Sequence, residues 1–341
     1  MIKSRIRIIL LSGSILITLI VGGIFFINPF QEQKVLKVFH AGSLTIPFED
    51  IEFIFEKNNP NVDIQLQSAG SVQCVSKITE ARKIPDVLAV ADWTLIKNMP
   101  LIYQHYYIKF AVNQMVLAFI NDTAQDAIIN KNNFYNILRS SGFGISNPNL
   151  DPCGYRSLIV LQLAEFAYND SLILDNLVLS HTTVTELTLD GNSTIYTPEN
   201  LNPDNFITIR DKSVDLITMV KEGSLPYAFE YRSVAVQHGL DYIELDDMID
   251  LSNANNDDFY RRVKVVRKSG VSEGKSITYG ITIPNNANEF DLAALFVEFV
   301  INEIGDFILS ISGQPPINPA RASPYIFLPA NLKPYCIEDK S

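Results

Sequence analysis

The sequence predicts an α/β protein built from two lobes, and three observations indicate it. Apolar strands alternate with amphipathic helices along the chain, which is the rhythm of parallel βαβ units. Four strand-to-helix junctions carry serine, glycine or an Asp-Pro turn, in the place where open α/β sheets bind ligands. With 341 residues, 47% hydrophobic and 19% charged, the chain is also long enough for two compact lobes.

The overall charge and the cysteines limit the classes of function. The formal net charge is −11, which argues against nucleic acid as a partner because a phosphate backbone needs clustered Lys and Arg. Neutral N–H and O–H donors can still hold a small anion without a basic patch. Cys74, Cys153 and Cys336 lie far apart and predict neither a disulfide framework nor a zinc site, although one pair could bridge.

The N-terminus predicts export from the cytoplasm. Lys3, Arg5 and Arg7 precede Ile8 to Ile27, a run of 20 uncharged residues. As a helix this run would be about 30 Å long, which is the thickness of a bilayer core. The basic flank would stay inside, so the rest of the chain would face outward. We interpret residues 1–33 as an uncleaved membrane anchor, with a cleaved signal peptide as the alternative.

The first lobe is predicted over residues 34–110. An apolar strand over 34–39 leads through a Gly-Ser turn into a helix with Phe48, Ile51 and Phe55 at helical spacing. The other elements expected in this lobe are a strand over 62–67, a helix over 71–83, a strand over 85–91 and a short helix or loop after Trp93.

The second lobe is predicted over 111–240, and the chain is expected to return to the first lobe over 241–341. A long strand over 110–120 opens the second lobe, because the alternation of strand and helix restarts there. Residues 172–203 show little pattern and predict loops with marginal strands. The other predicted elements are helices over 133–140, 152–169, 214–222 and 288–304, strands over 143–146, 226–231, 260–267 and 277–284, and a Pro-rich segment over 313–324 with a tail behind it.

The four junctions predict an anion site. At each of them, Ser43, Ser71, residues 151–153 and Ser213, a turn directs backbone N–H groups or a hydroxyl at the start of a helix, where the helix dipole is positive. A single junction of this kind is more often a routine helix cap. Because two junctions fall in each lobe, we favour a cleft between the lobes with donors from both sides.

Four motifs make a family resemblance visible. They are His-Ala-Gly-Ser-Leu at 40–44, Ser-Ala-Gly-Ser-Val at 68–72, Asp-Pro-Cys-Gly-Tyr-Arg at 151–156 and Ala-Phe-Glu-Tyr-Arg-Ser-Val-Ala at 228–235. Together they resemble the archaeal tungstate/molybdate-binding proteins of the WtpA/ModA type, which serve ABC transporters. The resemblance covers about residues 35–335. It implies a type II periplasmic-binding-protein fold, with two α/β lobes joined by two crossing strands, and a tetrahedral oxyanion in the cleft.

The resemblance also implies the contacts of the oxyanion and the partners of the protein. Several archaeal members have Glu at the position of Ser213, where it helps to complete octahedral metal coordination, so the Ser leaves the coordination number open. Glu230 could replace that carboxylate, but strand alternation predicts that it points away from Tyr231. A monomer is expected, with a permease and its ATPase as partners and with neither cofactor nor catalysis. The implied contact residues are Gly42, Ser43, Ser71, Asp151, Pro152, Cys153, Ser213 and Tyr231.

Other functions remain open from the residues alone. The carrier could prefer tungstate or molybdate, or could transport another ion such as sulfate. A ferric carrier could use the phenolates of Tyr103, Tyr106 and Tyr107, although a packed aromatic loop is favoured. An enzyme could use Cys153 as a nucleophile with a lowered pKa at a helix N-terminus. A surface receptor that only shares the fold is a further alternative. Candidate bases for the enzyme are His40, His105, His181 and His238.

Overall fold

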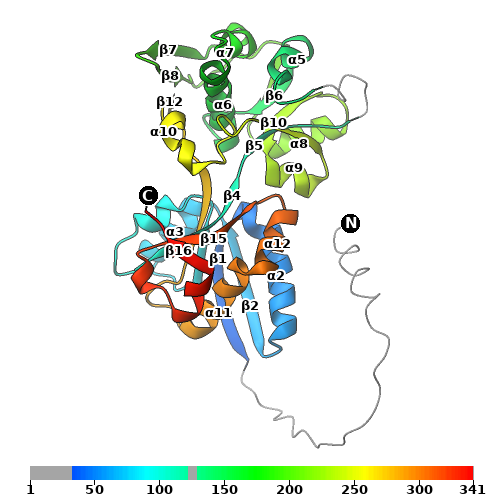
Figure 1. Cartoon of the computed structure of the whole chain (residues 1–341). Coiled ribbons are helices and arrows are strands. Elements are labelled where there is room, and N and C mark those ends of the chain that lie inside the picture. The colour runs from blue at the N-terminus through cyan, green and yellow to red at the C-terminus, as the bar shows by residue number, and fades with distance from the viewer. Residues whose placement is uncertain (1–32, 122–128, 341) are drawn as a thin grey trace, which may run out of the picture. The chain divides into compact units, whose positions relative to one another are not determined.

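Three β-sheets organise the computed structural model, which describes residues 33–121 and 129–340. Figure 1 shows two α/β regions with the strand β4 leading from one to the other. Residues 34–341 group as one compact unit. The predicted membrane anchor at Ile8 to Ile27 lies outside the described residues. No helix within the described residues is long and apolar enough to cross a membrane.

The seven-stranded sheet forms the core of the first region, which we call lobe I. Its strand order is β16-β15-β4-β14-β3-β1-β2, with β1 parallel to both β2 and β3. The predicted helical spacing after Ser43 is confirmed, because α2 buries Phe48, Ile51 and Phe55 beneath it. The strands are β1 (Lys34–Ala41), β2 (Val62–Ala69), β3 (Val87–Val90), β4 (Tyr107–Asn113), β14 (Ile277–Thr282), β15 (Pro316–Ser323) and β16 (Cys336–Glu338), and the helices are η1 (Gly42–Leu44), α2 (Thr45–Asn58), α3 (Ser71–Thr79), α4 (Thr94–Lys97), α11 (Phe290–Ile301), α12 (Glu303–Ile311), η4 (Tyr325–Phe327) and η5 (Ala330–Tyr335).

The register of lobe I brings three strand ends together. His40 of β1 pairs with Ser68 of β2 on one side and with Ala89 of β3 on the other. Parallel strands in this register end at the same edge of the sheet, so the turns that follow them are neighbours. The corners at Gly42 and Ser71 therefore lie next to each other, although the chain separates them by almost thirty residues.

A five-stranded sheet carries the second region, lobe II, in the order β11-β5-β10-β6-β9. The strand β6 runs parallel to β9 and to β10, so α6, α8 and α9 all begin at the same edge of this sheet. The strands are β5 (Met115–Phe119), β6 (Phe143–Ser146), β9 (Ile207–Arg210), β10 (Ala228–Tyr231) and β11 (Asp241–Glu244), and the helices are α5 (Phe134–Ser141), α6 (Pro152–Tyr168), α7 (Ile173–Leu177), η2 (Leu179–His181), α8 (Ser213–Lys221), α9 (Arg232–His238), η3 (Ala254–Asn256) and α10 (Asp257–Tyr260).

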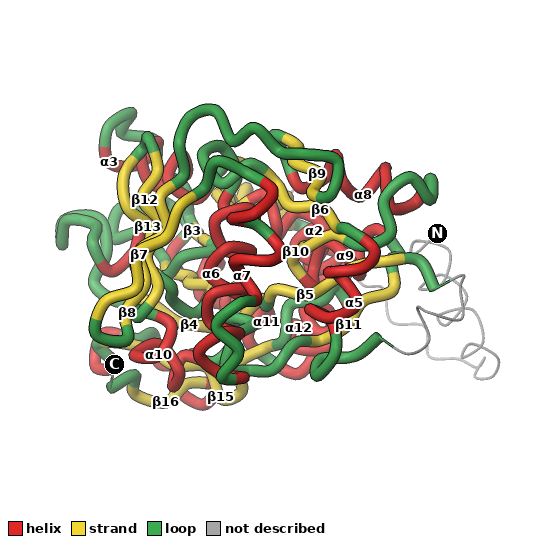
Figure 2. Tube along the Cα trace, turned by 90° about the horizontal axis from the view of Figure 1, so that it is seen from above, coloured by secondary structure: helices red, strands yellow, loops and turns green. Residues whose placement is uncertain are grey.

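A third sheet covers one side of α6. Figure 2 shows α6 and α7 next to each other, with the strands of this sheet grouped to one side of them. Where the sequence predicted mostly loops over 172–203, the structure has α7 and two regular strands. The four strands, in the order β13-β12-β8-β7, are β7 (Thr185–Leu189), β8 (Asn192–Tyr196), β12 (Val263–Arg267) and β13 (Gly270–Glu273).

The chain changes sheet at two places that connect the lobes. The predicted long strand over 110–120 is divided at Gln114 into β4 of lobe I and β5 of lobe II. The second connection is the segment between β13 and β14, which contains Lys275. The expected return at 241 differs from the sheet pairing, because β11 pairs with β5 and the chain rejoins the seven-stranded sheet only at Ile277. The strand β11 has only four residues, of which the first and last are acidic and exposed, so its pattern does not identify the sheet that it joins.

Candidate functional site

The first corner of lobe I is one turn of 3-10 helix over Gly42–Leu44. The Tyr279 hydroxyl donates to Ser43 Oγ at 3.1 Å, and Gln314 Nε2 donates to the Ser43 carbonyl at 2.7 Å. Gly42 is exposed, and its carbonyl accepts a hydrogen bond from Thr45 Oγ1 at 2.8 Å. The side chains of Tyr279 and Gln314, which the sequence did not predict at this site, therefore fix the position of the corner.

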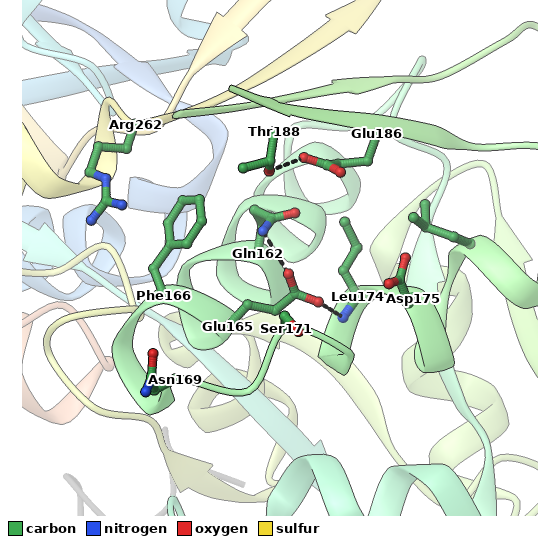
Figure 3. Close-up of a pocket in the computed structure, with 11 residues that line it drawn as sticks. Gln162, Glu165, Phe166, Asn169, Ser171, Leu174, Asp175, Glu186, Thr188 and Arg262 are labelled. Carbon is green, nitrogen blue, oxygen red and sulfur yellow. Dashed lines mark hydrogen bonds between the residues drawn. The ribbon is translucent and has the colours of Figure 1, made fainter. Parts of the chain in front are cut away.

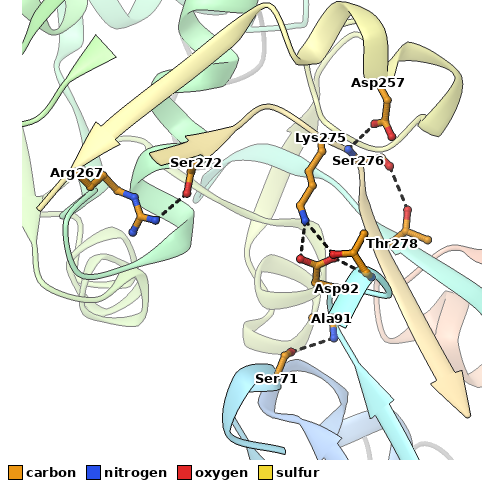
Figure 4. A network of polar contacts seen from close by, with 10 residues as sticks. Ser71, Ala91, Asp92, Asp257, Arg267, Ser272, Lys275, Ser276 and Thr278 are labelled. Carbon is orange, nitrogen blue, oxygen red and sulfur yellow. Dashed lines mark hydrogen bonds and ion pairs between the residues drawn. The ribbon is translucent and has the colours of Figure 1, made fainter. Parts of the chain in front are cut away.

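The second corner begins at Ser71, the first residue of α3. Its Oγ accepts a hydrogen bond from the Ala91 amide at 3.1 Å, which joins the corner to the end of β3 (Figure 4). The next residue, Asp92, forms an ion pair with Lys275 at 2.5 Å. Burial would raise the pKa of Asp92, but Lys275 and Thr94 outweigh it and hold that pKa below its ordinary value. Lys275 thus ties lobe I to the second connection between the lobes.

A chain of hydrogen bonds crosses from the first corner into lobe II. Behind Ser43, the Tyr279 hydroxyl accepts a hydrogen bond from Asn113 Nδ2 at 3.1 Å. The same amide nitrogen donates to Ser233 Oγ at 2.8 Å. Tyr279 lies on β14, Asn113 ends β4 and Ser233 lies in the first turn of α9. One corner of lobe I is therefore connected to a helix N-terminus of lobe II through Tyr279 of β14 and Asn113 of β4.

In lobe II, Asp151 joins two helix N-termini. It is the N-cap of α6, where its Oδ1 accepts from the Cys153 amide at 3.0 Å. Its Oδ2 accepts from the Ser213 amide at 2.7 Å. The sequence predicted backbone donors for a ligand at these positions, but in this structure both amides donate to the Asp151 carboxylate. Pro152 has no N–H to donate and is exposed.

The helix α8 begins at Ser213, one residue before the predicted start at 214, so Lys212 and not Ser213 is its N-cap. The Ser213 side chain is buried at 7% exposure. Its position at the start of α8 still places its amide at the positive end of the helix dipole.

Tyr231 is paired with a cation that the predicted site omitted. Arg156 Nη1 donates to the Tyr231 hydroxyl at 2.5 Å, and the guanidinium carbon lies 5.5 Å from the centre of the Tyr231 ring. The signal was present in the sequence, because Arg156 is one helical turn after Cys153 in the same motif. It brings a permanent positive charge to the start of α6.

Arg156 also lines a cavity with residues of lobe I. The cavity has a volume of about 420 Å³ and lies between the start of α6, the corner after β3 and the second connection between the lobes. Its lining combines cations, carboxylates and one aromatic ring. The lining residues are Asp92, Tyr155, Arg156, Ile159, Leu251, Val271, Ser272, Glu273 and Lys275.

The structure corrects the expectation that Cys153 could be a nucleophile. Its side chain is fully buried, and Sγ donates to the Phe229 carbonyl at 3.5 Å. Burial, with further contributions from Glu230 and Asp151, raises the pKa of the thiol well above its ordinary value. A thiol held neutral in this way is inert. All three cysteines are free and buried, so none of them forms a disulfide.

Glu230 lies behind the same helix starts. Its side chain is 1% exposed, and Oε1 accepts from the Tyr231 amide at 2.8 Å. Oε2 has no hydrogen-bond partner among the described residues. Burial raises the pKa of Glu230 to about 7, while the Tyr231 amide and Ser213 act in the opposite direction. Glu230 therefore belongs to the buried support of these helix starts.

The tyrosines considered for ferric iron are packed in lobe I. Tyr106 and Tyr107 are 3% and 4% exposed, and the Tyr107 hydroxyl donates to Asp339 at 3.1 Å. Burial raises the pKa of both phenols, that of Tyr107 to about 12, so neither becomes a phenolate at neutral pH. Within the described residues, no group of three or more His, Cys, Asp or Glu side chains could hold a metal ion. The favoured alternative, packed aromatic side chains, is therefore confirmed for Tyr106 and Tyr107, although Tyr107 begins the strand β4 and does not lie in a loop.

A second cavity lies elsewhere on lobe II, near the C-terminal end of α6. Figure 3 shows residues of α6, α7 and the strand β7 around it, and its volume is about 460 Å³. Glu165 accepts hydrogen bonds there from Gln162 Nε2 and from the Leu174 amide, both at 2.8 Å. None of the predicted contact residues lines this cavity, which is lined by Gln162, Glu165, Phe166, Asn169, Ser171, Leu174, Asp175, Leu179, Glu186, Thr188 and Arg262.

Comparison with known proteins identifies the family. A family model described as bacterial extracellular solute-binding protein matches residues 36–313. The chain belongs to this family. It is 44% identical over 296 residues to a solute-binding protein of Methanoculleus marisnigri, covering 85% of this chain and 83% of that protein. Members of this family are solute-binding proteins and not enzymes.

A relative with a stated ligand and a solved structure extend the comparison. The chain is 37% identical over 305 residues to the molybdate/tungstate-binding protein WtpA of Thermococcus kodakarensis, with 86% of this chain and 85% of that protein covered. Its fold is similar to a solved substrate-binding domain assigned to a molybdenum ABC transporter of Clostridium difficile, at a TM-score of 0.57 and 16% identity, covering 83% and 99% of the two chains. The predicted two-lobe fold and the family resemblance are confirmed.

Proposed function

We propose that this solute-binding protein captures molybdate or tungstate outside the cytoplasm and delivers it to the permease of an ABC transporter. One observation carries the proposal. The four predicted motifs lie at strand ends and helix starts of both lobes, and the start of α6 shares a cavity with lobe I. The ligand named for the relative WtpA supports the choice of oxyanion.

The proposed contacts in lobe I are neutral donors. The Gly42 amide, the Ser43 hydroxyl and the Ser71 hydroxyl would donate to oxygens of the anion. Both hydroxyl oxygens already accept a hydrogen bond from the protein, from Tyr279 and from the Ala91 amide respectively. Each hydroxyl proton therefore remains for a ligand acceptor.

The proposed contacts in lobe II combine donors with charge. Tyr231 would donate through its hydroxyl, Ser213 would contribute through the start of α8, and Arg156 would balance the dianion electrostatically. Asp151 would hold the two helix starts, α6 with Pro152 and Cys153 and α8 with Ser213, in a fixed relation. Because both Asp151 oxygens accept amides in this structure, we favour a four-coordinate oxyanion over six-coordinate metal.

Binding energy and selectivity follow from this contact set. Hydrogen bonds to a charged acceptor contribute about 1.5–3 kcal/mol each, so six to eight of them offset the cost of association at sub-micromolar affinity. Contacts from both lobes would stabilise a closed arrangement, because the anion then binds one conformation better than the other. Selectivity against sulfate would come from the spacing of these donors, which would fit the larger anion.

The location of the carrier is part of the proposal. The extracellular family agrees with export, and residues 1–33 would anchor the protein beside its permease. A monomer with a permease and an ATPase as partners completes the proposed system. Cell fractionation of a tagged protein tests the anchor, because a cleaved signal peptide would leave the protein in the soluble fraction.

Calorimetric titration of residues 34–341 tests the function. The ligands are molybdate, tungstate, sulfate, phosphate and ferric citrate. We expect one-to-one binding of molybdate or tungstate, with sulfate at least about a hundredfold weaker, since a pocket fitted to the larger anion leaves sulfate oxygens short of their donors. No heat with either oxometalate would refute the proposal. X-ray absorption at the metal edge then distinguishes four from six oxygen neighbours.

A further inference from the structure

The short segment over residues 312–314 contacts both lobes. It follows α12 of lobe I, and all three of its residues are buried. Gln314 Nε2 donates to the Ser43 carbonyl at 2.7 Å, which fixes the segment to the first corner of lobe I. From lobe II, Gln237 Nε2 of α9 donates to the Ser312 carbonyl at 3.3 Å. The segment is therefore attached to the first corner on one side and to α9 on the other.

Gly313, in the middle of this segment, packs directly against the backbone of α9. A Cβ atom at this position would lie 2.7 Å from Ser233 Cα and 3.0 Å from the Arg232 carbonyl oxygen. Carbon atoms in contact lie about 3.5–4.0 Å apart, so a side chain here would displace the start of α9 by about 1 Å. The φ of Gly313 is +82°, which also favours glycine. Both the backbone angle and the close approach of the two lobes therefore require glycine.

Each end of this contact leads to a proposed contact of the anion. In lobe I, Gln314 directly follows Gly313 and holds the carbonyl of Ser43. In lobe II, Ser233 lies in the first turn of α9, whose N-cap is Tyr231. A contact between two backbones contains no side-chain rotamer that could absorb a change in its length. The distance from Ser43 to Tyr231 across the cleft therefore depends on the contact at Gly313.

We propose that Gly313 is a positioning residue that sets the spacing between the donors of lobe I and those of lobe II, and thereby the affinity for the oxyanion. The inference rests on the proposed function and adds the residue that fixes its geometry. Gly313 is not among the proposed contacts of the anion. A shift of about 1 Å would lengthen a hydrogen bond of about 2.8 Å beyond the range in which hydrogen bonds form. A small change at Gly313 should therefore be felt by the ligand.

Gly313→Ala tests the inference by calorimetric titration with molybdate. The added methyl group would hold the lobes further apart, so at least one hydrogen bond across the cleft should be lost. We expect molybdate affinity to fall at least about tenfold. In crystal structures with molybdate bound, the distance from Ser43 Oγ to Tyr231 Oη should be longer in the variant than in the wild type by about 1 Å. A residue that only stabilised the fold would leave this distance unchanged.

Gly239→Ala is the matched control for backbone strain. Gly239 ends the same helix, α9, with a φ of +67°, so alanine is strained there in a similar way. Within the described part of the chain, nothing beyond its chain neighbours and its own helix lies within 4 Å of a Cβ atom at Gly239. Both variants should lose stability in thermal unfolding, but only Gly313→Ala should lose affinity. An equal fall of molybdate affinity in Gly239→Ala would overturn the inference, because strain alone would then explain it.

Gln237→Ala tests the same contact from the side of lobe II. It removes the hydrogen bond to the Ser312 carbonyl and loosens the contact between the segment and α9. We expect molybdate affinity to fall about threefold, as for the loss of one neutral hydrogen bond that supports the site. If Gly313→Ala does not fold, an unaltered affinity in Gln237→Ala sinks the inference. Wild-type protein that binds no oxometalate refutes the proposed function, whereas wild-type binding with unaltered affinity in Gly313→Ala refutes only the inference.

Discussion

The two lobes present their strand-end corners in different ways. In lobe I, the hydroxyls of Ser43 and Ser71 accept from the protein behind them, so each keeps a proton that it can donate. In lobe II, the amides at the starts of α6 and α8 are turned inward onto the Asp151 carboxylate. Lobe II therefore depends on the Asp151 carboxylate for the arrangement of its helix starts, while lobe I keeps neutral hydroxyl donors at its corners. Substitutions should affect stability most in lobe II, and ligand affinity most in lobe I.

Replacing Asp151 should have the largest effect, because it breaks the link between two helices. Asp151→Ala leaves the amides of Cys153 and Ser213 without their acceptor and removes the cap of α6. We expect the free energy of unfolding to fall by about 3 kcal/mol, measured by urea denaturation. Asp211→Ala, at an exposed position just before α8, is the control and should change it by less than about 0.5 kcal/mol. Similar losses in both variants would contradict the role of Asp151.

The raised pKa of Glu230 should make the free energy of unfolding depend on pH, through a group that belongs to lobe II. Its pKa in the folded protein is about 7, above the ordinary value of 4.5. Below pH 4.5 the carboxyl is protonated in both states. Between pH 4.5 and 7 only the unfolded chain ionises, so stability decreases as pH rises, by about 3 kcal/mol in total. In Glu230→Gln this part of the slope should be absent.

Glu52→Gln provides the matched comparison in lobe I. Burial, together with nearby Glu56 and Glu49, raises the pKa of Glu52 to about 7 as well, but its side chain is only half-buried on α2. Solvent screening should make its effect on the slope much smaller than that of Glu230. Denaturation curves at pH 5 and pH 8 for the three proteins give the slopes, and equal slopes in wild type and Glu230→Gln would refute the assignment.

The hydroxyl donors of lobe I should affect binding more than stability. Ser71→Ala removes a proposed ligand donor and leaves the Ala91 amide without its acceptor. We expect molybdate affinity to fall by about 10- to 100-fold, which corresponds to one charge-assisted hydrogen bond. Ser76→Ala is a control on the same helix, since Ser76 Oγ donates to the exposed Glu80 instead. An unchanged dissociation constant in Ser71→Ala would remove Ser71 from the proposed contacts.

Among these variants, a substitution of Arg156 that keeps the positive charge should have the smallest effect on molybdate affinity. Arg156→Lys retains a cation but loses the planar donor that meets the Tyr231 hydroxyl. We expect the molybdate affinity of Arg156→Lys to fall by about tenfold at low salt. The molybdate affinity of Arg156→Gln should fall further and should depend much less on salt concentration. Titrations at two ionic strengths separate the two variants, and identical salt dependence in both would show that Arg156 does not act through its charge.

The sequence predicted local elements best where a single face or turn decides them. The apolar spacing of Phe48, Ile51 and Phe55 identified α2, because one buried face is enough to specify an amphipathic helix. Prediction was weakest where a segment had to choose between sheets. The chain was expected to return to lobe I at residue 241, but the strand that begins there pairs with β5 of lobe II, since the partner of a four-residue strand leaves no trace in the periodicity.

In the candidate site, too, local features were predicted correctly and features that depend on distant residues were not. Its motifs could be located because glycine, serine and proline at strand-to-helix turns have local physical reasons. The Cys153 pKa was expected to be lowered, because the sequence shows the helix start but not the complete burial that outweighs it. Arg156 stood inside a recognised motif and could have been found from its helical spacing.

By itself the sequence determined the α/β class, the positions of the four corners and the family, because each depends on residues close together in the chain. Only the tertiary structure decided what those corners offer to a ligand. Asp151 reaches Ser213 across 62 residues, and Tyr279 reaches Ser43 across 236. Whether a hydroxyl or an amide faces a ligand depends on which buried partner lies behind it, and that partner is chosen by the packing of the whole chain.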